Sequence, residues 1–466
     1  MMYMHRHLPN PLKSTINSII ATITCWVAGT IFMNATDAFS IIPSISSHEA
    51  INSLGNSLRI DPLSVSSTNQ VSIGINAWWL ASSDTTSRSP TTVVATIAPP
   101  SDEDVTLLRS AFAEMYRPIK SGPRDYEKAH QLLSSAILRW EGQPDDERAG
   151  LYRVRGDCNM IRTGATSSAA DLANAAYSDY SMAVSLLQKP DARKLADPQE
   201  YPASLLGRAR AAKSLSNMSN IKKEEQRRYA KSATEDYRAA LIALGRVNNM
   251  DDDDIYEDGD RLEEGMKRNP YAAWEWGDSI WKSGNDYVNA ANVQKQTSTY
   301  FDKIGDRARS VITLIDAGIA LAAAPGEDQV SRAEDILRTA IQSTVGVQSR
   351  DVQLLQHVIT KEGEGRMALA ALLWSDGKRM EAEQVLGEAC VRLDQLQAQI
   401  DLDAKRSNGA SNMDEPRLLY SIDDNTVYPR GKVLSCSDFK KPQFLSEKLE
   451  WPETLQKKVT KLETLQ

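Results

Sequence analysis

A triplet of one large residue between two small ones recurs through the middle of this 466-residue chain. The large residue follows the first small residue by four positions, and the second small residue comes three later. Residues at these spacings share one face of an α-helix, where small side chains let a second helix approach closely. Each triplet therefore predicts one helix of a tightly packed pair. The triplets are Ala129/Leu133/Ala136, Ala176/Tyr180/Ala183, Ala233/Tyr237/Ala240, Ala333/Leu337/Ala340 and Ala382/Leu386/Ala389.

A second series of small residues precedes most of the triplets. Each lies within a stretch whose apolar residues recur at three- and four-residue spacing, which predicts a first helix in front of the triplet helix. This periodicity runs from Ser101 to about Lys405, and the alternation typical of strands is nearly absent. The fold class expected is therefore all-α. The small residues expected where paired helices cross are Gly156, Gly207, Gly318 and Ala370.

One interval between triplets is about twice as long as the others, and an aromatic run lies within it. The run is "NPYAAWEWGDSIWKSGNDY", residues 269–287. We interpret it as a further first helix, with Gly277 at the crossing, Trp276 as the adjacent large residue and Tyr287 at the start of the partner helix. Tryptophans at helical spacing are more often core than a cofactor-binding wall. The run therefore predicts a hairpin core.

These paired helices resemble those of tetratricopeptide repeat proteins over residues 104–396. The resemblance implies a helical-hairpin solenoid of about six hairpins with insertions, whose first helices line a groove that binds protein segments. The Asn of the carboxylate-clamp subgroup is not found after the crossing residues, which disfavours that function. Each predicted groove residue could equally be an ordinary solvated charge. These residues are Arg153, Asp157, Arg208, Asp278 and Lys282.

Composition shifts divide the chain into segments. An acid-rich stretch separates two groups of hairpins and is expected to be a solvated linker. Near the end, Leu455, Val459 and Leu462 share one face of a predicted closing helix, which either covers the solenoid or docks a partner. The segments expected are hairpins over 101–246, the acidic linker over 247–268, hairpins over 269–400, a linker over 401–442 and the C-terminal helix over 443–466.

The N-terminal region is expected to direct the chain to a compartment. Residues 1–38 contain basic residues followed by a short apolar run, which is typical of a signal peptide; a short membrane anchor is the alternative. The junction "TDAFSIIP" around Ala38 and Phe39 resembles that of plastid proteins in diatoms. The resemblance implies a transit peptide over 39–100 and a plastid location, stromal or thylakoid-associated, with the lumen as another destination. A secreted protein with a Ser-rich leader is the other interpretation.

Charge, cysteine spacing and catalytic motifs exclude several functions. The net charge of −8 argues against a DNA partner, because nucleic-acid binding needs excess Lys and Arg. No C-x-x-C pair occurs, although a disulfide among Cys158, Cys390 and Cys436 stays open. The sequence contains no nucleotide-binding or hydrolase motif. We therefore expect no catalytic residues, no cofactor and no metal.

The stretch 269–396 also resembles plastid tetratricopeptide proteins of plants and algae. That resemblance implies a non-enzymatic scaffold whose partner is a protein of a thylakoid or stromal complex, with a role in assembly or stability. Two alternatives stay open. One is an organellar helical-repeat protein that binds RNA, and the other is a regulatory module that holds a plastid enzyme.

Overall fold

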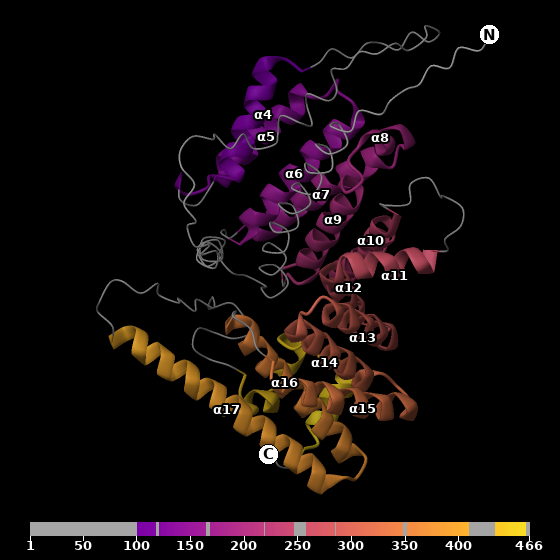
Figure 1. The fold of residues 1–466 in the computed structure, drawn as a ribbon, viewed down its shortest axis with the longest axis vertical. Coiled ribbons are helices and arrows are strands. Elements are labelled where there is room, and N and C mark those ends of the chain that lie inside the picture. Colours follow the sequence, from indigo (N-terminus) through magenta and orange to yellow (C-terminus); the bar gives the residue numbers. More distant parts are fainter. Residues whose placement is uncertain are drawn as a thin grey trace, which may run out of the picture.

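The fold is a stack of antiparallel helical hairpins. The computed structural model describes residues 100–117, 121–164, 168–218, 220–246, 258–284, 286–347, 352–409 and 434–462, and the regular secondary structure within these ranges is all helical. Consecutive helices pair, and the pairs stack one after another along the long axis (Figure 1). This arrangement confirms the predicted all-α helical-hairpin solenoid. The pairs are α4 (Asp102–Met115) with α5 (Tyr126–Arg139), α6 (Asp145–Thr163) with α7 (Ala169–Leu187), α9 (Glu200–Ser216) with α10 (Lys223–Arg246), α12 (Pro270–Ser283) with α13 (Tyr287–Lys303), α14 (Arg307–Ala323) with α15 (Glu327–Ser343), and α16 (Val352–Ser375) with α17 (Arg379–Gly409).

The triplets form the seams of this stack. None of their residues exposes more than 4% of its surface, and all lie on the second helix of a hairpin. The glycines of the first helices face the large residues closely. A Cβ atom would lie 2.9 Å from Tyr180 at Gly156, 2.7 Å from Gln294 at Gly277 and 2.6 Å from Leu337 at Gly318. Side-chain atoms do not approach so closely, so these crossings need residues without a Cβ.

Gly207 packs differently from the prediction. A Cβ atom at this position would lie 2.2 Å from Tyr180, which belongs to the preceding hairpin. Tyr180 is thus held between Gly156 of its own hairpin and Gly207 of the next. Gly207 was expected to cross its own partner helix near Tyr237, and that interpretation was wrong.

Two equivalent ion pairs give the true register of α9. Arg155 of α6 donates to Asp179 of α7 at 2.5 and 3.0 Å, and Arg208 of α9 donates to Asp236 of α10 at 2.6 and 2.7 Å. Each aspartate directly precedes the large residue of its triplet. The equivalent of Gly156 in α9 is therefore Ala209, which is fully buried. The sequence-based register was shifted by two residues.

Part of the predicted acidic linker is a helix. α11 (Asp258–Arg268) packs against α10, while residues 247–257 lie outside the described ranges. The two helices touch backbone to backbone, because a Cβ at Gly265 would lie 1.8 Å from the Leu241 carbonyl oxygen and one at Gly245 would lie 2.0 Å from that of Arg261. Glycine spacing lets two helices pack this closely. The other insertion is the short helix α8 (Pro190–Leu195).

The chain after α17 does not form the single closing helix that was predicted. It contains a 3-10 helix η3 (Cys436–Lys440), α18 (Pro442–Glu447) and α19 (Glu453–Val459). We call residues 434–462 the C-terminal segment. It lies beside α14, α16 and α17 (Figure 1). α17 also extends nine residues into the predicted 401–442 linker, and residues 410–433 and 463–466 lie outside the described ranges.

One disulfide bond links the last hairpin to the C-terminal segment. Cys390 of α17 and Cys436 of η3 form a disulfide, which resolves the pairing that the sequence left open, and Cys158 is buried with a free thiol. The predicted signal and transit peptides, up to residue 99, lie outside the described ranges. Among the helices that are described, none is both long and apolar enough to cross a membrane.

We expect Gly207→Ala to lower the free energy of unfolding by about 1–3 kcal/mol, because the added methyl group would overpack Tyr180. The matched control is Gly387→Ala in α17, where a Cβ would meet nothing within 4 Å. This control should raise the same free energy by up to about 1 kcal/mol, because alanine favours helix over glycine. Urea denaturation of both variants measures the difference. Equal stability of the two would contradict the packing of Tyr180 against Gly207.

Candidate protein-binding surface

Charged side chains on successive first helices are joined in a row of ion pairs. The row begins on α6, continues through α9 and α12, and reappears between α14 and α16. It follows the positions next to the helix crossings, where the close approach of the backbones brings side chains of neighbouring hairpins together. We call it the ion-pair row. Its members are Arg153, Asp157, Glu200, Arg210, Lys213, Glu275, Asp278, Lys282, Asp316 and Lys361.

The α6–α9 part of the row is centred on Arg153. Its guanidinium donates to Asp157 at 2.7 Å on the same helix and to Glu200 of α9 at 2.5 Å. The Tyr180 hydroxyl donates to the other oxygen of Asp157 at 2.6 Å. Burial by itself would lower the pKa of Arg153, but Glu200 and Asp157 raise it. Burial raises the pKa of Asp157, although Arg153 opposes this. The arginine is thus held charged in a partly dehydrated site.

Two ion pairs join α9 to α12. Arg210 lies 3.0 Å from Glu275, whose side chain is only 4% exposed, and Lys213 lies 2.6 Å from Asp278. Burial would lower the pKa of Arg210, but Glu275 raises it. Burial would raise the pKa of Asp278, but Lys213 and Lys282 hold it far below its usual range. These pairs connect the two groups of hairpins through charge as well as apolar contact.

Further along, the row reaches the C-terminal segment. Lys282 of α12 lies 2.9 Å from Glu450, which precedes α19. Burial would lower the pKa of Lys282, but Asp278 and Glu450 raise it. Lys361 of α16 lies 3.1 Å from Asp316 of α14. The C-terminal segment is therefore bound through a carboxylate that contacts the row.

The structure brings four of the five predicted groove residues into this row. Arg153, Asp157, Asp278 and Lys282 belong to it, whereas Arg208 pairs with Asp236 inside its own hairpin. Each of these side chains is ion-paired and at most 34% exposed, so none is a fully solvated charge.

The two-residue error in the register of α9 explains why Arg210 was not predicted from the sequence. Arg210 comes directly after Ala209, as Asp157 follows Gly156 and Asp278 follows Gly277. The shift of two residues in α9 selected Arg208 in place of Arg210. Pairing between neighbouring hairpins could not be found without the stacking order. The other missed members are Glu200, Lys213, Glu275, Asp316 and Lys361, and the missed contact on the C-terminal segment is Glu450.

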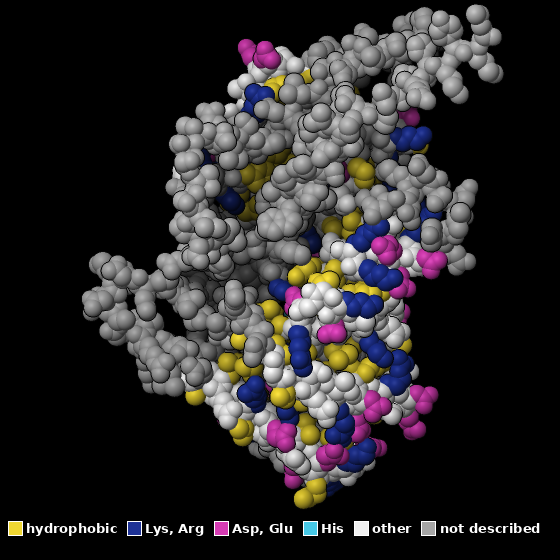
Figure 2. All heavy atoms as spheres, viewed as in Figure 1, with side chains coloured by type: hydrophobic (Ala, Val, Ile, Leu, Met, Phe, Trp, Pro, Cys, Tyr) yellow, Lys and Arg dark blue, Asp and Glu magenta, His cyan; other side chains and the backbone are white. Residues whose placement is uncertain are grey.

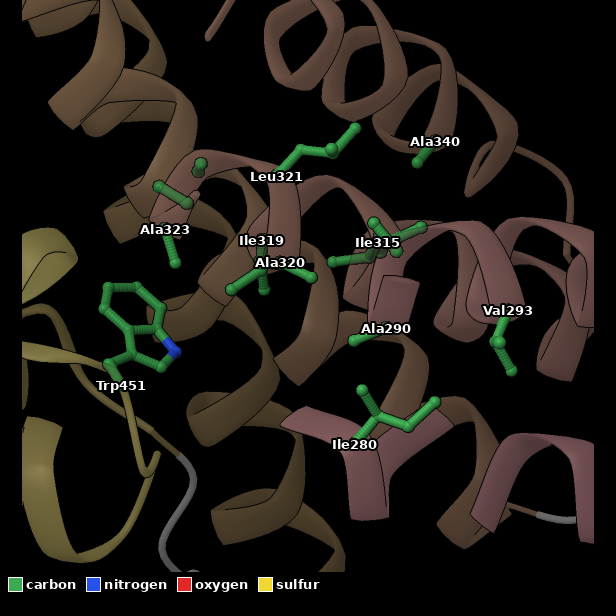
Figure 3. Packing of buried hydrophobic residues seen from close by; sticks show 14 of the residues in the cluster. Ile280, Ala290, Val293, Ile315, Ile319, Ala320, Leu321, Ala323, Ala340 and Trp451 are labelled. Atoms are coloured by element: carbon green, nitrogen blue, oxygen red, sulfur yellow. The ribbon is translucent and has the colours of Figure 1, made fainter. Parts of the chain in front are cut away.

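Buried residues of α12, α14 and α16 beside the row hold the C-terminal segment, and we call this surface the apolar floor; it includes Ile280, Ile319, Ala323 and Ala371. Trp451 is 3% exposed and lies in one core cluster with Ile280, Ile319 and Ala323 (Figure 3). Leu455, Val459 and Leu462 of the same segment are fully buried. The face that was predicted either to cover the solenoid or to dock a partner therefore covers the solenoid.

The C-terminal segment also caps a helix. The Thr454 hydroxyl donates to the Ala323 carbonyl at 3.1 Å, and the Lys458 ammonium donates to the Ala322 carbonyl at 3.1 Å. These carbonyls lie in the last turn of α14, which leaves its final acceptors without partners inside the helix. A cation there also interacts favourably with the helix dipole, although burial lowers the pKa of Lys458.

The aromatic run of α12 lies in the hairpin core. Trp274 packs edge-to-face against Phe301 of α13, with ring centroids 6.1 Å apart, and stacks on His357 of α16 at 6.4 Å. Trp276 is 6% exposed. Trp281 contacts Tyr287 edge-to-face at 5.3 Å. Two of these contacts lie within the α12–α13 hairpin and one reaches α16, which agrees with the hairpin core interpreted from the sequence.

Opposite charges lie interspersed on the visible face of the lower half (Figure 2). Lys and Arg side chains lie there among Asp, Glu and hydrophobic side chains. Within the part of the chain that the structure describes, no group of three or more His, Cys, Asp or Glu side chains is placed to hold a metal ion.

Comparison of the chain with models of protein families and with the sequences of curated proteins finds no match.

We expect Arg210→Met to lower the free energy of unfolding by about 3–5 kcal/mol, because it leaves the Glu275 carboxylate buried without its partner. The double variant Arg210→Met/Glu275→Leu should lose much less, because no charge then stays uncompensated. Urea denaturation of both single variants and the double variant measures this coupling. Losses that simply add would contradict a coupled pair.

Proposed function

We propose that this protein is a non-enzymatic scaffold of the plastid that binds a protein segment, with a role in the assembly or stability of a thylakoid complex. The plastid location and the role rest on the resemblances in the sequence. The binding mode is supported by the hairpin solenoid, because stacked first helices form an extended surface suited to peptides.

The observation that carries the proposal is the seating of the C-terminal segment. An aromatic anchor at Trp451, a buried helical face and an ion pair from Glu450 to Lys282 hold a stretch of chain against first helices. These are the elements by which helical-repeat grooves and amphipathic helices recognise one another. The surface therefore has the chemistry needed to hold a protein segment.

An RNA partner has less support. Counterion release requires basic groups that are available to phosphates. Arg153, Arg210, Lys213 and Lys361 of the ion-pair row each contact a carboxylate within 3.1 Å. Binding phosphates through these residues would require breaking partly buried ion pairs. A protein segment with both signs of charge can hydrogen-bond to both members of an intact ion pair, so the row favours a protein partner.

Affinity capture tests the proposal. We expect the tagged full chain to retain specific proteins from thylakoid and stromal extracts, and to retain them after nuclease treatment. The paired variant Lys213→Gln/Asp278→Asn removes a matched charge pair and leaves Lys282 with Glu450. Its capture should fall several-fold, since the row loses the polar contacts it offers between α9 and α12.

The matched control is Arg228→Gln/Glu225→Gln, which removes an exposed pair on α10. Exposed pairs contribute at most about 1 kcal/mol, so both capture and thermal stability should match wild type. Circular dichroism melts confirm that both variants are folded. Capture that depends on RNA, or equal capture by both variants, would contradict the proposed surface.

A second prediction concerns location. Residues 1–100 fused to a fluorescent protein should enter the plastid in a diatom cell, because Ala38 and Phe39 resemble a diatom plastid junction. Phe39→Ala should divert the fusion before the plastid. Fluorescence microscopy against chlorophyll emission gives the readout. Secretion or endomembrane retention of the wild-type fusion would overturn the plastid location.

A further inference from the structure

We propose that the apolar floor on α12, α14 and α16 is a recognition surface for an amphipathic segment, and that the Cys390–Cys436 disulfide decides whether the chain's own C-terminal segment or a partner's segment occupies it. This inference rests on the proposed protein-binding function. It adds which residues the bound segment must carry and how the disulfide controls access of that segment to the apolar floor.

The seated segment defines what the surface recognises. After α18 its buried apolar anchors are Trp451, Leu455, Val459 and Leu462, which are at most 3% exposed. Leu455 and Val459 lie one turn apart on α19, and Trp451 and Leu462 flank this helix at four- and three-residue spacing. A partner that fits the same surface therefore carries an aromatic residue followed by aliphatic residues at this spacing.

Polar contacts at both ends set the direction of the segment. An acidic residue directly before the aromatic anchor pairs with Lys282, as Glu450 does at 2.9 Å. A hydroxyl and a basic residue further along reach the last carbonyls of α14, as Thr454 and Lys458 do at 3.1 Å. Reversing the segment would remove all of these contacts. The surface is thus selective both for the residues of the bound segment and for the direction in which its chain runs.

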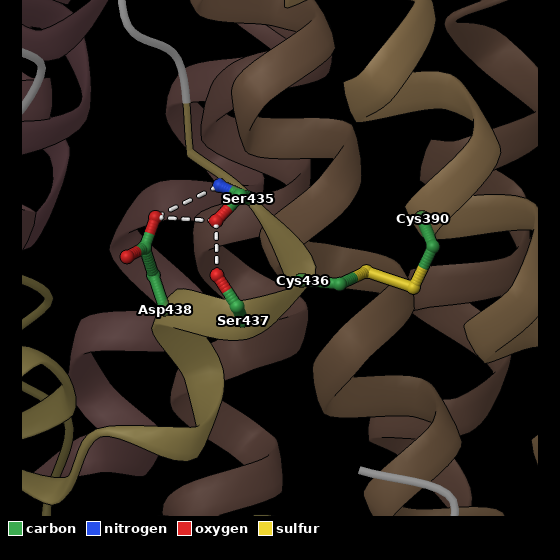
Figure 4. The surroundings of a disulfide bond; sticks show 5 residues. All are labelled: Cys390, Ser435, Cys436, Ser437 and Asp438. Carbon is green, nitrogen blue, oxygen red and sulfur yellow. Dashed lines mark hydrogen bonds between the residues drawn. A yellow bond between two sulfur atoms is a disulfide. The ribbon is translucent and has the colours of Figure 1, made fainter.

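The disulfide ties this segment to the last hairpin. Cys436 opens η3, six residues before α18 begins, and Cys390 lies within α17 (Figure 4). Both cysteines are only partly buried, so the bond lies at the edge of the core rather than inside it. When the bond is open, the chain that follows Gly409 is the only covalent link between the solenoid and the segment. The disulfide therefore shortens the tether between the solenoid and its own ligand.

The length of the tether sets the local concentration of the segment. Opening the disulfide lengthens the tether to α18 from roughly six to roughly thirty residues. Effective concentration falls approximately as the −3/2 power of tether length, which corresponds to a decrease of about tenfold. A competing segment in solution should bind about tenfold more tightly to the reduced protein.

The chemical step is thiol–disulfide exchange with an external dithiol. One thiolate of the dithiol attacks a sulfur of the bond, which forms a mixed disulfide and releases the other cysteine as a thiolate. The second thiol of the reagent then displaces the remaining cysteine. Cys390 and Cys436 take up two electrons and two protons in total, and the dithiol leaves as a disulfide.

A peptide binding experiment tests the inference. The probe is a fluorescent peptide of residues 449–462, "LEWPETLQKKVTKL", and the protein is the full chain, oxidised or treated with dithiothreitol. Fluorescence anisotropy should show an apparent affinity about tenfold higher for the reduced protein. Cys390→Ser and Cys436→Ser should each behave like reduced protein under either condition. A peptide with Trp451→Ala should lose most of its binding to all forms, because the aromatic anchor is missing.

The control for thiol chemistry is Cys158→Ala, which removes the buried free thiol but keeps the disulfide. It should retain the full redox response. Equal binding by oxidised and reduced protein would overturn the disulfide's role, and no binding by reduced protein would overturn the recognition surface. The test uses only this chain. Normal peptide binding without capture of plastid proteins would instead contradict the proposed scaffold function alone.

Discussion

Tyr180 is enclosed by glycines from two different hairpins, and this contact shows the constraint on which the rest of the stack depends. The helices come this close to the Tyr180 ring only because Gly156 and Gly207 carry no side chain. The same contact places the Tyr180 hydroxyl 2.6 Å from Asp157, so close packing also orients a charged group. Apolar seams and polar contacts therefore share one origin, and neither could be changed independently of the other.

Forming the ion-pair row requires charged side chains to be partly dehydrated, which costs free energy. Dehydrated ion pairs are often no more stabilising than apolar residues of the same size. Pairs such as Arg210 with Glu275 specify which helices face one another, because a shifted register would leave a charge unpartnered. We interpret the row as a device that sets the stacking order of hairpins whose apolar seams are otherwise much alike. An amphipathic segment that contacts the row meets fixed charges of both signs.

Local spacing predicted the hairpins well, because each triplet shows its buried face within one helix and the facing glycine, as in Gly156 and Gly318, lies in the helix directly before it. It failed where the partner comes from elsewhere. Gly207 contacts Tyr180 of the preceding hairpin, and no periodicity within α9 reveals that. α11 has the acidic composition of a linker, yet Gly245 and Gly265 permit a backbone contact that composition does not show. The disulfide joins residues 46 positions apart, and the sequence alone could not select it among the alternatives.

The contact between α10 and α11 has a mechanical consequence. Helices separated by side chains can shift slightly against one another when the side chains change rotamer. Between α10 and α11 no side chain intervenes at Gly245 and Gly265, so the angle there is set by the main chain itself. The junction between the two groups of hairpins should therefore keep a fixed angle between α10 and α11. Bending of the solenoid under load would have to take place in the hairpins on either side of it.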